Sequence, residues 1–194
     1  MSRRFLFMLP ILIAIAFVPV ARAQVLPATP DPVSCSLTPL TPDELLTITA
    51  VTAEEPAPLM ATRMTVPQET VDAVTEVVLA SLACTNANQP LSALAVYSDR
   101  WLQERFSGDA GRDELGHLIA ASSRTPMEAA VQDRIALISV ENPMAYNGAR
   151  IGITVTTANA DETYIDELIF VQVNSDWKID QTIARPDSNA TPQA

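Results

Sequence analysis

Few residues of this chain are of types that could perform acid–base chemistry. The chain has 194 residues and a single histidine, His117. Asp99 follows Tyr97 closely, and Asp166 follows Tyr164 at the same spacing. Aspartate and histidine side chains can transfer protons, and tyrosine hydroxyls can donate hydrogen bonds to a developing negative charge. A single histidine excludes a multi-histidine metal site, and nothing in the sequence indicates any other metal or cofactor.

The motifs of the common enzyme classes are absent from the sequence. It contains no HExxH, no GxSxG, no glycine-rich phosphate loop and no EF-hand spacing. Ordinary structural roles also account for each candidate: Asp166 as a solvated strand-end carboxylate, His117 as a surface residue of a short helix, and Asp99 as a hydrogen-bonded or solvated aspartate. The residue types therefore favour a protein without catalysis over an enzyme.

The first 23 residues have the three parts of a secretory signal peptide. Arg3 and Arg4 form a basic start, residues 5–20 are apolar, and Ala21 and Ala23 are small residues at the positions that a signal peptidase reads. Residues 5–21 would span roughly 25 Å as a helix, which is short of the roughly 30 Å of a bilayer core. We expect cleavage after Ala23, a secreted or extracytoplasmic protein, and no stable membrane anchor afterwards.

The negative net charge of the mature chain disfavours two classes of binding partner. Removing the three arginines of residues 1–23 changes the net charge from −11 to −14, because all 23 acidic residues lie beyond them. Such a negative chain is not expected to bind nucleic acid or an anionic membrane surface. The length predicts a single domain.

The two cysteines, Cys35 and Cys84, predict a disulfide. An even number of cysteines in an oxidising compartment is typical of a bridge. Two buried free thiols are the alternative. A metal or redox role is disfavoured because the cysteines lie far apart and no CxxC occurs.

Residues 24–65 read as a proline-rich arm with one short helix. Prolines recur too closely there for long regular elements. Thr41 can cap a helix, Pro42 suits its first position, and Glu44 completes a capping box.

Residues 66–184 predict an α+β domain. Helical periodicity indicates three N-terminal helices over about residues 66–84, 90–106 and 113–122, with a loop at 107–111. The period then changes to two, which predicts a curved antiparallel sheet of about four strands, with turns at 147–148 and 174–175. In the last strand, Asp180 is expected on the polar face, opposite Trp177 and Ile179. Residues 185–194 are expected to be a disordered tail.

Three stretches carry a resemblance to a known family. They are ACTNAN and PLSALAVYSD at 83–88 and 90–99, LIFV and WKID at 168–171 and 177–180, and DELL at 43–46. With this order of elements, residues 66–184 resemble the nuclear-transport-factor-2-like superfamily, a SnoaL-like and cystatin-like α+β cone, in its secreted bacterial members. Asp176 stands where members often have glycine.

The resemblance implies a site inside the cone, between the helices and the curved sheet. Enzymes of the superfamily use an Asp or an Asp–His pair with tyrosine donors there, to remove a proton beside a carbonyl. Carried over to this chain, that implies catalytic candidates Asp99, His117 and Asp166. The ligand-binding candidates are Tyr97, Tyr146 and Tyr164. The resemblance also implies a homodimer through the open sheet face.

Three hypotheses for function follow. The first is a secreted, non-catalytic cone domain that binds a small apolar ligand or a protein partner. The second is an isomerase, cyclase or dehydratase with Asp99 or Asp166 as base. The third is a cell-envelope interaction module that makes its contacts through the arm.

Overall fold

The computed structural model describes residues 28–123, 130 and 133–185. The predicted signal peptide lies outside the described residues, as does the predicted tail from residue 186 onward. Among the described residues, no helix is both long enough and apolar enough to cross a membrane.

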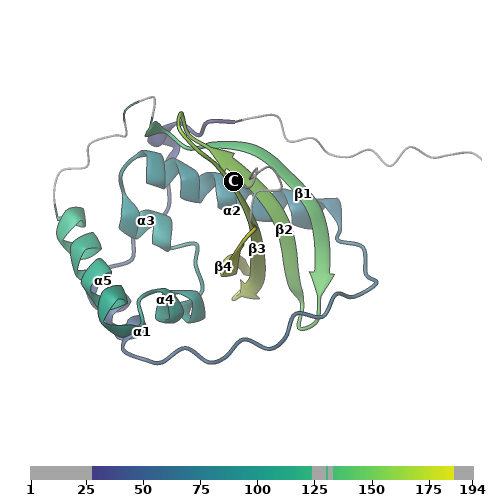
Figure 1. Cartoon of the computed structure of the whole chain (residues 1–194), viewed down its shortest axis with the longest axis horizontal. Helices are drawn as coiled ribbons and strands as arrows, with labels where there is room; N and C mark the ends of the chain where they lie inside the picture. The colour runs from purple at the N-terminus through teal and green to yellow at the C-terminus, as the bar shows by residue number, and fades with distance from the viewer. Residues whose placement is uncertain (1–27, 124–129, 131–132, 186–194) are drawn as a thin grey trace, which may run out of the picture.

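The fold is α+β, with a four-stranded antiparallel sheet and several helices (Figure 1). The helices are η1 (Pro32–Ser34), α1 (Pro42–Thr49), α2 (Gln68–Asn86), α3 (Pro90–Leu94), α4 (Asp99–Arg105) and α5 (Gly108–Ser122). The strands are β1 (Ala136–Tyr146), β2 (Arg150–Ala158), β3 (Thr163–Val173) and β4 (Asp176–Ala184), which pair in the order β1-β2-β3-β4.

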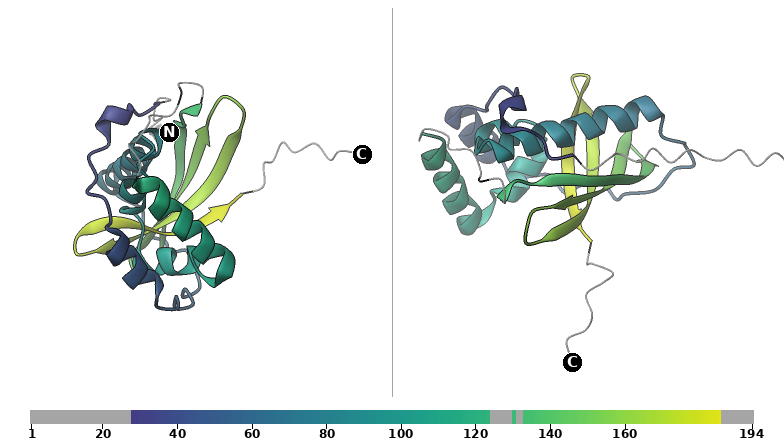
Figure 2. Two further views of the ribbon diagram at one scale, coloured as in Figure 1. Left: turned by 90° about the vertical axis from the view of Figure 1, so that its left-hand side faces the viewer. Right: turned by 90° about the horizontal axis from the view of Figure 1, so that it is seen from above.

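The main core lies between α2 and one face of the sheet. Figures 1 and 2 show α2 crossing that face, and both β1 and β4 contact it. Val74 of α2 meets Ile153 and Phe170 of the sheet, and all three side chains are fully buried. Helical periodicity in α2 and alternation in the strands each place these apolar residues on one side.

A second core joins α1, α3, α4 and α5, which lie at one end of the sheet in Figure 1. Its buried members are Leu45, Leu91, Leu94, Leu102, Phe106 and Leu115. These residues come from the arm and from α3, α4 and α5, so this core ties the arm to the body of the domain.

The predicted helix in the arm is confirmed. Thr41 precedes α1 and its hydroxyl accepts from the Glu44 N–H at 3.2 Å, while the Glu44 carboxylate accepts from the Thr41 N–H at 2.8 Å. Pro42 occupies the first turn. These two hydrogen bonds satisfy amide groups that would otherwise be unpaired at a helix start.

Covalent and hydrogen bonds fix the start of the arm to α2 and β1. The predicted disulfide between Cys35 and Cys84 is present. Ala28 pairs with Leu137 of β1 through both backbone groups, at 2.8 and 2.7 Å. The buried Asn86 amide donates to the Pro30 and Ile135 carbonyls, both at 3.1 Å, and accepts from the Ile135 N–H at 2.8 Å.

The predicted single helix over residues 90–106 is wrong, because residues 96–98 bond to the edge strand β4 instead. The Ile179 N–H donates to the Val96 carbonyl, and the Ser98 N–H donates to the Ile179 carbonyl, both at 2.9 Å. These backbone groups are then not free for helical bonds, so α3 ends at Leu94. α4 restarts with Ser98 as its cap, whose hydroxyl accepts from the Trp101 N–H at 3.1 Å.

The loop predicted at residues 107–111 is also wrong, because α5 begins at Gly108. Gly111 lies buried in its first turns, where a Cβ would come 2.5 Å from the Phe106 backbone carbonyl carbon. Glycine at this position therefore permits a close helix–backbone approach, rather than marking a loop.

The predicted sheet turns are present. Gly148 and Ala149 have positive φ between β1 and β2, and Asn174 and Ser175 have positive φ between β3 and β4. Asn174 and Ser175 form a two-residue turn, in which positive φ at both residues suits the right-handed twist of a hairpin. The loop between β1 and β2 has a third residue, Asn147. At the end of β4, the Arg185 N–H donates to the Ile165 carbonyl at 2.9 Å. The sheet therefore holds the first residue of the predicted disordered tail.

A bulge in β4 overturns the expected orientation of Asp180. Ile179 pairs with Phe170, and Gln181 pairs with Ile169, so Asp180 is the extra residue. Asp180 is only 7% exposed, and its carboxylate accepts from the Ser98 hydroxyl at 2.6 Å and from Arg100 Nε at 3.0 Å. The residue predicted on the polar face therefore fastens α4 to β4.

Candidate functional site

Three of the residues named from the sequence lie at the surface. Asp99 is exposed in the first turn of α4, and His117 is exposed on α5. Tyr164 is 45% exposed on β3, and its hydroxyl donates to Glu162. Hydrogen bonding to the Glu162 carboxylate is the main cause that raises the pKa of Tyr164. The structure does not bring these three residues together.

Tyr97 and Asp166 are both partly buried. Tyr97 follows α3 and packs against both cores, with its ring centroid 4.0 Å from that of Trp101. Asp166 lies on β3 on the same face as Leu168, a member of the main core. The negative charge of Asp166 contributes to raising the pKa of Tyr97.

Burial dominates the electrostatics of this pair. It is the largest cause that raises the pKa of Tyr97; hydrogen bonding by Ser81 opposes it, and the Asp166 charge adds to it. Burial also raises the pKa of Asp166. A carboxyl group with a raised pKa is a chemically reasonable proton acceptor, and a neutral tyrosine is a reasonable hydrogen-bond donor.

Ser81 is a member of this group that the sequence analysis did not name. The helical period that buries Val74 and Val78 also places residue 81 on the inner side of α2. The helical period was the available signal, but it identifies residue 81 only as buried. It does not indicate that the serine hydroxyl lies at Tyr97.

Tyr146 lies on the opposite face of the sheet, in a separate hydrogen-bonded group. Its hydroxyl donates to Glu167 Oε1 and Arg185 donates to Glu167 Oε2, both at 2.6 Å. The Tyr146 ring covers Gly152, where a Cβ would lie 2.6 Å from the ring carbon Cε2. Both carboxylate oxygens of Glu167 are occupied, so this group joins β1, β3 and the end of β4.

We expect Tyr146 to make stability sensitive to alkaline pH. Burial, followed by the Glu167 carboxylate, raises the pKa of Tyr146 to about 12, from an ordinary value of 10.0. Because the folded chain holds this proton more tightly than the unfolded chain does, the stabilisation is complete below pH 10 and is lost as the pH rises toward 12.

Urea unfolding across that pH interval tests the expectation. The Tyr146→Phe variant should lose less of its unfolding free energy across the interval than the wild type does. Identical slopes for the two proteins would contradict it. The comparison isolates Tyr146, because Tyr97 and Tyr164 are present in both proteins.

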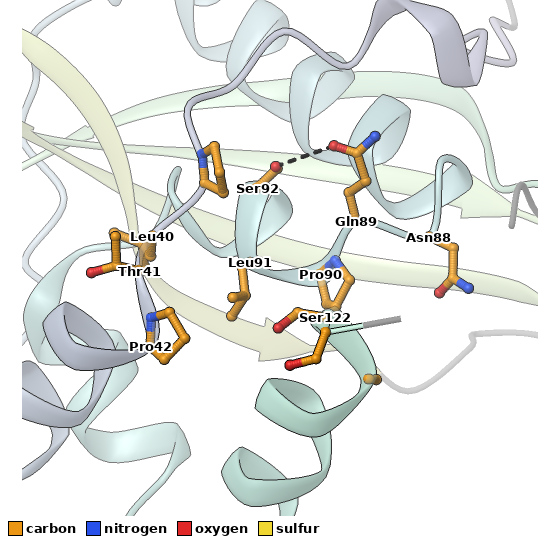
Figure 3. A pocket seen from close by; sticks show the side chains of 12 residues that line it. Leu40, Thr41, Pro42, Asn88, Gln89, Pro90, Leu91, Ser92 and Ser122 are labelled. Atoms are coloured by element: carbon orange, nitrogen blue, oxygen red, sulfur yellow. Dashed lines mark hydrogen bonds between the residues drawn. The ribbon is translucent and has the colours of Figure 1, made fainter. Parts of the chain in front are cut away.

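A cavity of about 490 Å³ opens between the arm, the α2–α3 corner and the end of α5 (Figure 3). Its lining consists of residues 39–42, 88–92 and 121–123. In Figure 3, Leu40 and Pro42 face Pro90 and Leu91 across the cavity, and Ser122 reaches it from α5. The volume lies within the usual range for small-molecule sites, about 300–1,000 Å³.

Among the described residues that line this cavity, none has an ionisable side chain. Its walls are prolines, leucines and an alanine, with hydroxyl and amide groups between them. The Gln89 Oε1 accepts from the Ser92 hydroxyl at 3.4 Å, and the Asn88 and Gln89 amides can both donate and accept. Such a lining suits an uncharged ligand with an apolar body and a polar group.

The arm positions one wall of this cavity. The Cys35–Cys84 disulfide holds the arm beside α2, and the Leu40 N–H donates to the Leu91 carbonyl at 3.2 Å. The sequence analysis missed this site, because its walls are far apart in the chain and consist of common structural residues. The predicted disulfide was the available signal that residues near 35 and 84 lie together.

The arm also exposes apolar side chains. Val33, Leu46, Val51, Met60 and Met64 are each at least half exposed. The interaction module predicted from the sequence would use such side chains, and that role stays a prediction.

Within residues 28–123, 130 and 133–185, no group of His, Cys, Asp and Glu side chains could hold a metal ion. Comparison of the chain with protein-family models, with curated proteins and with solved structures finds no match.

Proposed function

We propose that this protein is a secreted, non-catalytic binding domain of the nuclear-transport-factor-2-like type. It takes a small uncharged ligand in the cavity between the arm and the α2–α3 corner. The curved sheet and the helices would then form the cone of that superfamily, with the arm as an addition that builds the binding site. A homodimer through the open sheet face belongs to the same proposal.

One observation carries this function: the described residues that line the 490 Å³ cavity include no ionisable side chain. A site for a charged ligand needs an opposite charge or a strong set of donors, since burying an unpaired ion is costly. An apolar ligand needs only to remove water from such walls, at about 25 cal/mol per Å² of apolar surface. The Asn88 and Gln89 amides would orient one polar group of the ligand.

A pair of neighbouring substitutions on α5 tests the proposal. Ala120 and Ala121 are both exposed, but only Ala121 lines the cavity. We expect Ala121→Trp to fill the cavity and to weaken binding of a neutral apolar probe, N-phenyl-1-naphthylamine, by about tenfold or more. That loss corresponds to at least about 1.4 kcal/mol. Fluorescence titration of the probe measures it.

Ala120→Trp is the matched control and should bind the probe as the wild type does. The proposal fails if the wild type does not bind the probe, or if both tryptophan variants bind it equally well.

The Tyr97–Asp166 pair favours a second candidate function, the isomerase-type enzyme. Asp166 would accept a proton from the carbon beside a carbonyl, and the Tyr97 hydroxyl would donate to the enolate oxygen. If the protein is such an enzyme, the wild type should accelerate the exchange of the hydrogens beside the carbonyl of cyclohexanone for deuterium in D₂O, as followed by NMR. Asp166→Asn should lower the catalysed exchange rate by at least about 100-fold.

Asp99→Asn, at an exposed position on α4, is the control and should leave the exchange rate unchanged. A wild type that does not accelerate the exchange would count against this second candidate.

A further inference from the structure

A second cavity lies at the edge of the sheet, where α4 stands beside β4 (Figure 1). Its volume is about 620 Å³. The lining comes from Pro56 of the arm, from Trp101 and Arg105 of α4, and from residues 181–183 of β4. β4 is the last strand in the sheet order; residues 96–98 occupy its outer edge at Ile179, and the cavity lies beyond them, at residues 181–183.

Gln181 lines this cavity and has a hydrogen-bond donor that is buried and unpaired. Its Nε2 is the buried side-chain atom that lacks a hydrogen-bond partner in the part of the chain that the structure describes. On β4 it pairs with Ile169, whose side chain is fully buried. A buried donor without a partner costs about 1–3 kcal/mol. An acceptor on a bound ligand would remove that cost.

Backbone groups of β4 point to the same edge. Arg185 donates its N–H to the Ile165 carbonyl, and the register then runs without a shift back to Gln181. In an antiparallel ladder, alternate residues direct both backbone groups toward the partner strand. Thr182 therefore directs its N–H and C=O away from β3, toward the cavity that it lines.

The remaining walls suit an uncharged ligand with an apolar side chain. Trp101 and Ile183 supply apolar surface. The charged groups of the lining have partners: Glu104 bonds to Arg100 of the same helix at 2.8 Å, and Arg105 bonds to Glu114 of α5.

We propose that this cavity binds a peptide in extended conformation, which adds to β4 as a further strand. The peptide would exchange backbone hydrogen bonds with Thr182 and would give one carbonyl to Gln181 Nε2, while an apolar side chain lies against Trp101. This is the strand-addition mode of peptide recognition, in which backbone bonds provide affinity and pockets provide specificity. It uses a different site from the proposed small-ligand cavity, so each can fail independently.

Calorimetric titration with a capped peptide, Ac-Thr-Val-Thr-Val-Thr-NH₂, tests this proposal. We expect the wild-type mature chain to bind it, and a version N-methylated at alternate amides not to bind. Gln181→Leu should weaken binding about tenfold or more, yet its melting temperature should equal or exceed that of the wild type, because the substitution removes an unpaired buried donor. A role limited to folding would instead lower the melting temperature.

Gln172→Leu is the matched control, because the Gln172 amide already donates to the Ser175 carbonyl at 3.2 Å. It should leave peptide affinity unchanged. Gln181→Met, which keeps the side-chain length without the donor, should behave as Gln181→Leu does. The proposal is overturned if the wild type ignores the peptide, if the N-methylated peptide binds equally well, or if both Gln181 variants keep full affinity.

Discussion

Removal of the disulfide between Cys35 and Cys84 is expected to lower the free energy of unfolding by about 4 kcal/mol. The bridge joins residues 49 positions apart, and a loop of that length loses much conformational entropy when it is closed in the unfolded chain. Cys84 is also fully buried at the end of α2. Urea unfolding of a Cys35→Ala and Cys84→Ala double variant measures the loss.

The same double variant should lose binding in the small-ligand cavity. Residues 39–42 form one of its walls, and the bridge holds the start of the arm against α2. Reduction of the wild type with dithiothreitol should reproduce both effects, which separates the missing bond from the effect of the alanines. An unfolding free energy within about 1 kcal/mol of the wild-type value would contradict the expected role of the bridge.

Replacement of Asp180 by alanine is expected to destabilise the protein by about 3–5 kcal/mol. The carboxylate holds the Ser98 hydroxyl and both Arg100 contacts in a site that is 7% exposed. The Arg100 guanidinium is itself largely buried and also donates to the Asp180 carbonyl oxygen. Alanine would leave that cation without its main partner, which is more costly than the loss of an exposed ion pair.

Equilibrium urea unfolding measures this loss, with Asp176→Ala as the control. Asp176 begins the same strand but is exposed. The control should change the unfolding free energy by no more than about 0.5 kcal/mol. Because Asp180 anchors α4 to β4, Asp180→Ala should also change the fluorescence of Trp101 on α4. An Asp180→Ala variant as stable as the control would refute the anchoring role.

Local chemistry in the sequence predicted much of the secondary structure. The capping residues Thr41 and Glu44 predicted α1, and the two-residue alternation after residue 126 predicted an antiparallel sheet of four strands. Cys35 and Cys84 predicted the one covalent link. The helix and the strands depend on residues that are close in the chain. The disulfide needs no tertiary information, because each of the two cysteines has only the other as a partner.

The candidate sites depended on the tertiary structure. Asp166 and Tyr97 could be named as reactive types, but only the tertiary structure brings Tyr97 to Ser81. The small-ligand cavity consists of prolines, leucines and neutral polar residues from three distant segments. Such residues have no chemical signature of their own; their function depends on the shape that they enclose together.

The sequence alone determined the α+β class, the helix in the arm, the disulfide and the sheet turns. Only the tertiary structure decided where the helix after Pro90 breaks and which way Asp180 points. In the first case, Ile179 of β4 bonds to the backbone of residues 96–98, which is then not free for helical hydrogen bonds. In the second, a bulge turns the Asp180 carboxylate toward Arg100. Periodicity describes one segment at a time, so it cannot report a partner that arrives from 80 residues away.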